Sequence, residues 1–123
     1  MRTVLSTVRA YPAFGQLDLL LLQEAAETDG VPHAEPIAEA LGTGFQSHQR
    51  AVDQFYGARR GLGFIWNPGT IAVDAIELLR LPHCRESALP LWRRYPLQVA
   101  RLRERAALVL EGQAAGHSIR IYN

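Results

Sequence analysis

Hydrophobic positions along the chain recur mostly at spacings of three and four, which is typical of amphipathic helices. From Gln16 to Thr28, leucines lie on one face and glutamates on the other, so this segment predicts a helix that Asp29-Gly30 ends. Shorter helices are predicted over residues 2–10, 36–41 and 75–81, each with a proline near one boundary. A longer helix is predicted over residues 97–113.

The stretch from Pro36 to Ile65 has the most distinctive order of elements. After the 36–41 helix, Gly42-Thr43-Gly44 predicts a sharp turn, and Phe45 to Tyr56 predicts a second helix with a polar face. A strand over 62–66, a turn at Asn67-Pro68-Gly69 and a return through 70–73 predict a tight β-hairpin. This order is that of a helix-turn-helix followed by a wing.

The predicted fold class is therefore mainly α with a small β-hairpin wing, that is, a winged helix-turn-helix with additional C-terminal helices. At 123 residues and 48% hydrophobic content, the chain can bury one core, so one domain is expected over 1–123. Within it, residues 16–81 form the winged-helix core and 82–123 a C-terminal helical extension for dimerisation. Alternating residues from His117 to Tyr122 predict a terminal strand.

The charge is distributed unevenly between the two parts of the chain. Residues 1–40 are acidic, whereas the part from Leu41 onward has eleven arginines against six acidic residues, which favours a nucleic-acid partner. All thirteen basic residues are arginine, which codon bias explains as well as selection for planar donors does. The longest apolar run is only Leu19 to Leu22, and Cys84 is the single cysteine, so a cytoplasmic chain without a membrane span is expected.

Three short motifs carry a resemblance to a known family. They are IAEALG (37–42), QSHQRAVDQF (46–55) and RRGLGFI (59–65), and they resemble the winged-helix transcriptional regulators of the MarR type. The resemblance covers about residues 16–81 and implies a sequence-specific DNA-binding regulator, a repressor of bacterial or phage origin. The sequence departs from the family in its short wing, which has no cation between Trp66 and Thr70, and in Gln49, where the family has serine.

The expected DNA-binding residues lie on the polar face of the 45–56 helix and in the loop after it. Glutamine pairs well with adenine and arginine with guanine, while loop arginines neutralise phosphates. The alternatives are the solvent-facing side of an amphipathic helix and solvated loop charges, and His48 is expected in the core or at its boundary. The candidate DNA-binding residues are Gln46, Ser47, Gln49, Arg50, Gln54, Arg59 and Arg60.

No pattern in the sequence indicates catalysis, a metal or a cofactor. Adjacent His83-Cys84 does not match spaced metal ligands, and no phosphate-binding glycine loop or nucleophile motif is present, so the chain is not expected to be an enzyme. Double-stranded DNA and a second copy of the chain are the expected partners, since half-sites require two recognition helices. The alternative function is a winged-helix protein-interaction module, either an adaptor or an inhibitor. No small-molecule effector is indicated.

Overall fold

β-Strands dominate the computed structural model, which describes residues 2–55, 58–81 and 106–123. In these ranges the strands form two antiparallel sheets, one with the order β2-β1-β4-β3 and the other with the order β5-β6-β7. The elements are α1 (Arg2–Ala10), η1 (Pro12–Gln16), β1 (Leu19–Thr28), β2 (Val31–Pro32), α2 (Ala34–Leu41), β3 (Gln46–Phe55), β4 (Ala58–Trp66), β5 (Ile71–Arg80), β6 (Ala106–Ala114) and β7 (His117–Tyr122).

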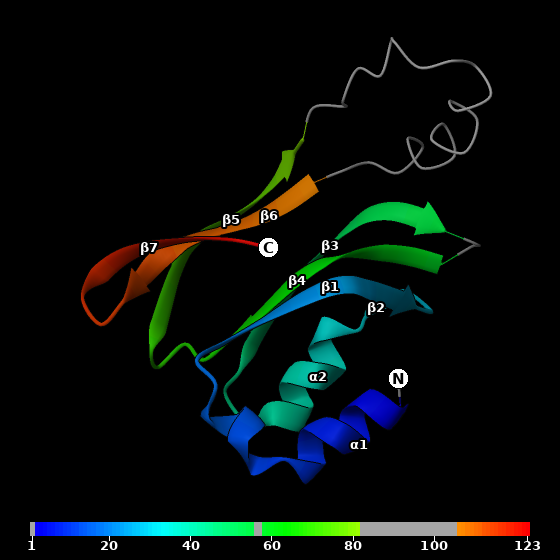
Figure 1. Ribbon diagram of the computed structural model, residues 1–123, viewed down its shortest axis with the longest axis horizontal. Helices are drawn as coiled ribbons and strands as arrows, with labels where there is room; N and C mark the ends of the chain where they lie inside the picture. Colours follow the sequence, from blue (N-terminus) through cyan, green and yellow to red (C-terminus); the bar gives the residue numbers. More distant parts are fainter. Residues whose placement is uncertain (1, 56–57, 82–105) are drawn as a thin grey trace, which may run out of the picture.

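Three layers are stacked in the order helices, four-stranded sheet and three-stranded sheet (Figure 1). We call the four-stranded sheet sheet A and the three-stranded one sheet B. The helices α1 and α2 cover one face of sheet A, and sheet B packs against part of the other face. The face of sheet A toward sheet B is called its inner face below, and the opposite one its helix face.

The central strand β4 contributes to two separate cores. Ile65 is fully buried against α1 and α2, whereas Phe64 and Trp66 are buried against sheet B. Because successive side chains of a strand point to opposite faces, one strand supplies both cores at neighbouring positions. On sheet B, Leu108 and Leu110 of β6 are fully buried in the core that the two sheets share.

The predicted hairpin between residues 62–66 and 70–73 is wrong, although both segments are strands. β4 pairs with β1 and β3 in sheet A, while β5 pairs with β6 in sheet B, so the turn carries the chain from one sheet to the other. Asn67 holds this connection, since its N–H donates to the Asp18 carbonyl at 2.9 Å and its side-chain oxygen accepts from the Gly69 N–H at 2.9 Å.

The winged helix-turn-helix and the mainly α fold class are both wrong. The predicted helices over 16–28, 45–56 and 75–81 are largely the strands β1, β3 and β5, and the 97–113 helix is strand β6 from Ala106 onward, with 97–105 outside the described residues. The predicted C-terminal helical extension is likewise replaced by β6 and β7 in its described part.

β1 shows most clearly why strands were predicted as helices. Leu20 and Leu22 pack toward the helices, while Leu19 packs toward sheet B, so leucines of one strand are half-buried on both of its faces. A strand buried on both sides has no polar stripe, and its consecutive apolar residues also contain the spacings of three and four that indicate a helix. Asp29-Gly30, expected to cap a helix, instead has positive φ values of 52° and 79° in the hairpin between β1 and β2.

Several local predictions are confirmed. The helix over 2–10 is α1, and the helix with Pro36 in its first turn is α2. Gly42 and Gly44 have positive φ values of 143° and 103°, as the predicted turn requires. The terminal strand over 117–122 is β7. Among the described residues, no helix is long and apolar enough to cross a membrane.

A glycine lies at a point of very close backbone approach in each sheet. A Cβ on Gly61 of β4 would overlap the Arg50 carbonyl of β3, and one on Gly112 of β6 would overlap the Ala72 carbonyl of β5. Both contacts lie next to register shifts, between Ala51 and Asp53 in one sheet and between Val73 and Ala75 in the other. Glycine is therefore required where a bulge brings two strands together.

We predict that Gly61→Ala destabilises the fold by about 2 kcal/mol or more, because the added methyl group overlaps backbone that cannot move aside. Gly15→Ala is the control, since a Cβ there would be in ordinary contact at 3.6 Å from the Leu41 carbonyl oxygen. Urea unfolding followed by circular dichroism measures both changes. Equal midpoints for the two variants would contradict the close approach.

Candidate functional site

A β-bulge in β1 places an acidic side chain in an unusual backbone conformation. Leu22 pairs with Gly63 and Ala25 with Gly61, so two residues, Gln23 and Glu24, lie opposite Leu62. Glu24 has φ of 51°. The other described non-glycine residues with positive φ, Asp29 and Ala115, each precede a glycine in a turn, whereas Glu24 lies inside a strand. Such strained positions occur disproportionately at functional sites.

Glu24 faces an arginine on the neighbouring strand. Its Oε2 lies 3.6 Å from Nη1 of Arg60, and the Glu24 side chain is 74% exposed. Arg60 lies two residues before Leu62 and four before Phe64, both of which pack toward sheet B, so Arg60 is on the inner face. At this exposure the ion pair adds little to stability, and the carboxylate stays accessible to a ligand.

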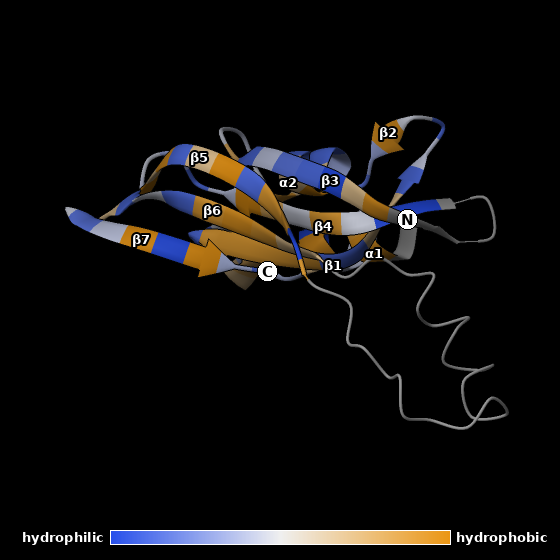
Figure 2. Ribbon diagram, turned by 90° about the horizontal axis from the view of Figure 1, so that it is seen from above, coloured by the Kyte–Doolittle hydropathy of each residue, from blue (hydrophilic) through white to orange (hydrophobic). Residues whose placement is uncertain are grey.

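Two residues of β3 share this inner face. His48 pairs with Phe64 and Arg50 pairs with Leu62, and directly opposite residues of antiparallel strands lie on the same face. Much of β3 is coloured as hydrophilic in Figure 2, next to more hydrophobic central strands. We call His48, Arg50 and Arg60, together with Glu24, which pairs with Arg60 and also borders a cavity on the helix side of β1, the inner polar cluster. It holds two arginines, one carboxylate and one imidazole where the apolar core between the sheets ends.

His48 is held in its neutral form by its surroundings. Burial lowers the pKa of His48, and the positive charge of Arg50 lowers it further. Its Nε2 is buried and has no hydrogen-bond partner. His48 was expected in the core or at its boundary, and its partial burial places it at the boundary. In this neutral form the imidazole can accept a proton as a base, and its two ring nitrogens can act as one hydrogen-bond donor and one acceptor.

Asn123 connects the two sheets beside the bulge. It continues the β6–β7 pairing, exchanging backbone hydrogen bonds with Leu108 at 3.0 and 3.1 Å. Its side-chain Nδ2 crosses to sheet A and donates to the carbonyls of Leu22 and Gly63, at 2.9 Å each. Leu22 is the residue before the bulge, so Asn123 fixes the strand where Gln23 and Glu24 leave the regular register. Its Oδ1 is buried and has no hydrogen-bond partner.

The seven predicted DNA-binding residues do not share one surface. They lie on β3 and β4, not on a helix and a loop, and the strand alternation divides them between two faces. Gln46, Arg50 and Arg60 are on the inner face, whereas Ser47, Gln49 and Arg59 are on the helix face. Gln54 lies in β3 opposite Arg59, and its side chain is outside the described residues.

Gln49 and Arg59 have structural partners. The Gln49 side-chain oxygen accepts from the Ala34 N–H at 3.1 Å, and its Nε2 donates to the carbonyls of Ala25 and Ala26, also at 3.1 Å each. The N-cap residue His33 makes no side-chain capping hydrogen bond. The Gln49 oxygen therefore accepts the hydrogen bond of the first backbone N–H of α2 in its place. Arg59 pairs with Glu27 at 3.1 Å.

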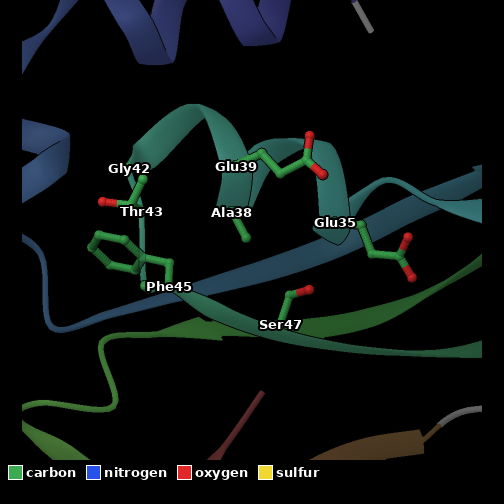
Figure 3. Close-up of a pocket in the computed structure, with 8 residues that line it drawn as sticks. Glu35, Ala38, Glu39, Gly42, Thr43, Phe45 and Ser47 are labelled. Atoms are coloured by element: carbon green, nitrogen blue, oxygen red, sulfur yellow. The ribbon is translucent and has the colours of Figure 1, made fainter.

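Ser47 lies in a separate cavity on the helix face. The cavity has a volume of about 420 Å³ and lies between α2 and the start of β3 (Figure 3). Ser47 shares it with Thr43, Phe45 and the carboxylates Glu35 and Glu39. Two acidic side chains in this cavity disfavour the DNA phosphates that the sequence analysis expected at this surface.

Glu24 and Asn123 were not among the residues predicted from the sequence. The signal available for Glu24 was the polar pair Gln23-Glu24 directly after four leucines, which becomes visible once the leucines are interpreted as a strand buried on both faces. Nothing local distinguishes Asn123, because its role depends on partners that are 60 and 101 residues away in the sequence. In the described part of the chain, no three His, Cys, Asp or Glu side chains come together as a metal site.

No protein-family model matches the chain, and no curated protein sequence matches it either. Solved structures do match. Over the whole chain, it superposes on an endonuclease/exonuclease/phosphatase family protein from Leptotrichia buccalis C-1013-b, with a TM-score of 0.68 at 15% identity. ANGEL2, a 2',3'-cyclic phosphatase, matches with a TM-score of 0.64 at 16% identity, and its complex with adenosine-2',3'-vanadate with 0.63 at 15%. At this identity the likeness establishes the fold.

The chain spans less than half of these matching proteins, 46% of the Leptotrichia chain and 30% of ANGEL2. The match overturns the MarR-type resemblance and, with it, the DNA-binding transcriptional regulator and repressor. The protein-interaction module receives no support. The matching proteins are named as enzymes, which is at odds with the expectation that this chain is not one. Double-stranded DNA and a homodimer stay untested as partners.

We predict that Asn123→Ala lowers the free energy of unfolding by about 1–3 kcal/mol, because two partly buried carbonyl groups lose their shared donor. Asn67→Ala is a matched control, since its side-chain oxygen makes one exposed turn bond, to the Gly69 N–H. Urea unfolding of the two variants measures the difference. A larger loss for Asn67→Ala would show that Asn123 does not hold the sheets together.

We predict that acid destabilises the fold in part through His48. Its pKa is lowered in the folded state, so the unfolded chain binds the proton more tightly, and stability falls as the pH drops below the ordinary value of 6.5. His48→Gln should therefore lose less stability than the unsubstituted chain between about pH 7.5 and about pH 5.5. His117→Gln, on the exposed β7, is the control. Thermal unfolding across this interval would refute the assignment if the His48→Gln profile matched that of the unsubstituted chain.

Proposed function

We propose that this chain forms part of a phosphoester hydrolase whose site is the inner polar cluster. The observation that carries the proposal is Glu24, an exposed carboxylate at a strained bulge beside an arginine, in the fold of endonuclease/exonuclease/phosphatase proteins. The proposed substrate class is a nucleotide phosphoester, and a 2',3'-cyclic phosphate is the first candidate because one matching structure is named for that activity.

The two arginines suit a phosphate. A guanidinium presents several N–H donors in a planar fork that matches phosphate oxygens, and it stays charged at all relevant pH values. Arg50 and Arg60 lie on the same face of adjacent strands, so both can approach one anionic group. Donors fixed in this way stabilise the negative charge that develops on phosphate oxygens during phosphoryl transfer.

Glu24 has the opposite charge and a different role. Mg²⁺ is commonly bound through one or two carboxylates together with substrate phosphates, and it keeps several waters. An accessible carboxylate beside phosphate-binding arginines fits one such ligand position. A divalent cation bound there would withdraw charge from the phosphate. The described residues supply no group of three ligands, so Glu24 would be one ligand among others that they do not provide.

His48 and Asn123 support this site in different ways. Because His48 is held neutral, it could accept a proton from an attacking water as a general base. Asn123 is a positioning residue, because it holds the Leu22 carbonyl and thereby the strand that leads into Glu24. The bulge geometry consequently depends on a contact that spans the two sheets.

We predict that Glu24→Gln reduces hydrolysis of adenosine 2',3'-cyclic monophosphate by about 100-fold or more, since the amide removes the negative charge while keeping the shape. The assay contains Mg²⁺ and follows the nucleotide product by chromatography. Calorimetric titration with adenosine-2',3'-vanadate adds a binding measurement, because transition-state analogues bind far more tightly than substrates.

Glu111→Gln is the matched control for this substitution. Glu111 forms an exposed ion pair with Arg120 at 2.8 Å on sheet B, away from the inner polar cluster. It should keep the activity and the vanadate affinity of the unsubstituted chain. Equal losses in both variants, or neither turnover nor vanadate binding in the unsubstituted chain, would refute the proposed function.

A further inference from the structure

Glu24 and Arg60 carry opposite charges in the proposed site, and they face each other. Nη1 of Arg60 lies 3.6 Å from Oε2 of Glu24. A carboxylate paired with a guanidinium is less available to a cation, and the guanidinium is less available to a phosphate. Each of the two side chains therefore competes with the ligand of the other.

The ion pair between Glu24 and Arg60 is loose. Its separation of 3.6 Å compares with 3.1 Å between Arg59 and Glu27, the neighbouring ion pair of the same two strands. The Glu24 side chain is 74% exposed, and solvent-exposed ion pairs of this kind contribute little to stability. A ligand of modest affinity can therefore separate the two side chains.

The backbone on both sides of this ion pair is held in place. Arg60 lies on β4, the strand between β1 and β3 (Figure 1), and pairs with Ala26 of β1 and Asp53 of β3. Glu24 lies in the bulge of β1, which has regular pairs before and after it. An exchange of partners accordingly takes place in the long side chain of Arg60 and requires no movement of either strand.

Either ligand alone meets a like charge at this pair. A divalent cation that binds Glu24 approaches the guanidinium of Arg60, and a phosphate that binds Arg60 approaches the carboxylate of Glu24. When both ligands are present, the cation faces Glu24, and the phosphate faces Arg60 and Arg50 on the adjacent strand. Every charge then has a neighbour of opposite sign.

We propose, on the basis of the phosphoester function proposed above, that Arg60 makes the site bind a divalent cation and a phosphoester together. The phosphate draws the Arg60 guanidinium away from Glu24, and the carboxylate that is released binds the cation. By thermodynamic linkage, the cation then strengthens phosphate binding by the same factor. The form of substrate that the site takes is thus a pair of cation and nucleotide.

The first measurement uses the unsubstituted full chain, with Mn²⁺ as the cation and adenosine 2'-monophosphate as the phosphate. Mn²⁺ accepts the same oxygen ligands as Mg²⁺, and the relaxation rate of water protons reports its binding. The nucleotide should raise the Mn²⁺ affinity of the protein by about threefold or more, after a blank without protein is subtracted. Equal Mn²⁺ affinity with and without the nucleotide would overturn the proposal.

Arg60→Gln separates the role of this arginine from the direct attraction between the two ligands. Without nucleotide, the variant should bind Mn²⁺ about twofold to fivefold more tightly than the unsubstituted chain, because Glu24 loses its competitor. Without Mn²⁺, it should bind the nucleotide about tenfold more weakly, because a charged donor to the phosphate is lost. A misfolded variant would instead bind both ligands more weakly.

Arg59→Gln is the matched control, since it removes the same charge from the neighbouring residue, which pairs with Glu27 on the helix face. It should leave both affinities unchanged. If Arg60→Gln bound Mn²⁺ no more tightly than the unsubstituted chain, or if Arg59→Gln gained as much, the coupling by Arg60 would be refuted while the hydrolysis that depends on Glu24 stood. Binding of neither Mn²⁺ nor nucleotide to the unsubstituted chain would refute the proposed function and the coupling together.

Discussion

The burial of β4 on both faces is the constraint on which the rest of the structure depends. Ile65 must be covered by helices and Phe64 and Trp66 by a second sheet, so a single strand determines the order of the three layers. Gly61 and Gly63 leave β4 without side chains at two positions, and the neighbouring strand β3 approaches β4 most closely at Gly61. Every element that carries a candidate functional residue pairs with β4, or is held to it by Asn123.

The apolar and polar residues of β4 have different roles in the structure. From Leu62 to Trp66 the inner face belongs to the core shared with sheet B, whereas Arg60 on the same face meets Glu24 across the bulge of β1. The fold tolerates the positive φ of Glu24 because the pairs on both sides of it are regular and Asn123 holds the Leu22 carbonyl. Strain at one residue is therefore supported by contacts that are themselves unstrained.

The sequence predicts the local features that depend on a few neighbouring residues. The two helices, the turn at Gly42 and Gly44 and the terminal strand follow from proline, glycine and alternation. It does not predict the sheets, because Leu19 to Leu22 satisfies helical spacing as well as burial on two faces, and only long-range pairing decides between them. Because the sheets were not predicted, the candidate site was not predicted either. Arg50 and Arg60 were noticed for their charge, but their shared face depends on a register between strands, and Glu24 and Asn123 depend on partners distant in the sequence.

The two connections between the sheets lie close together on β4. The chain passes from sheet A to sheet B just after Trp66, and Asn123 joins the sheets at Gly63. The relative placement of the sheets is thus fixed within one short stretch of the strand, while Arg50, Arg60 and Glu24 lie beyond it and pack in neither core. The residues of the inner polar cluster are consequently different from those that fix the placement of the sheets. Substitutions at Glu24, Arg50 and Arg60 are therefore expected to leave the packing of both cores unchanged.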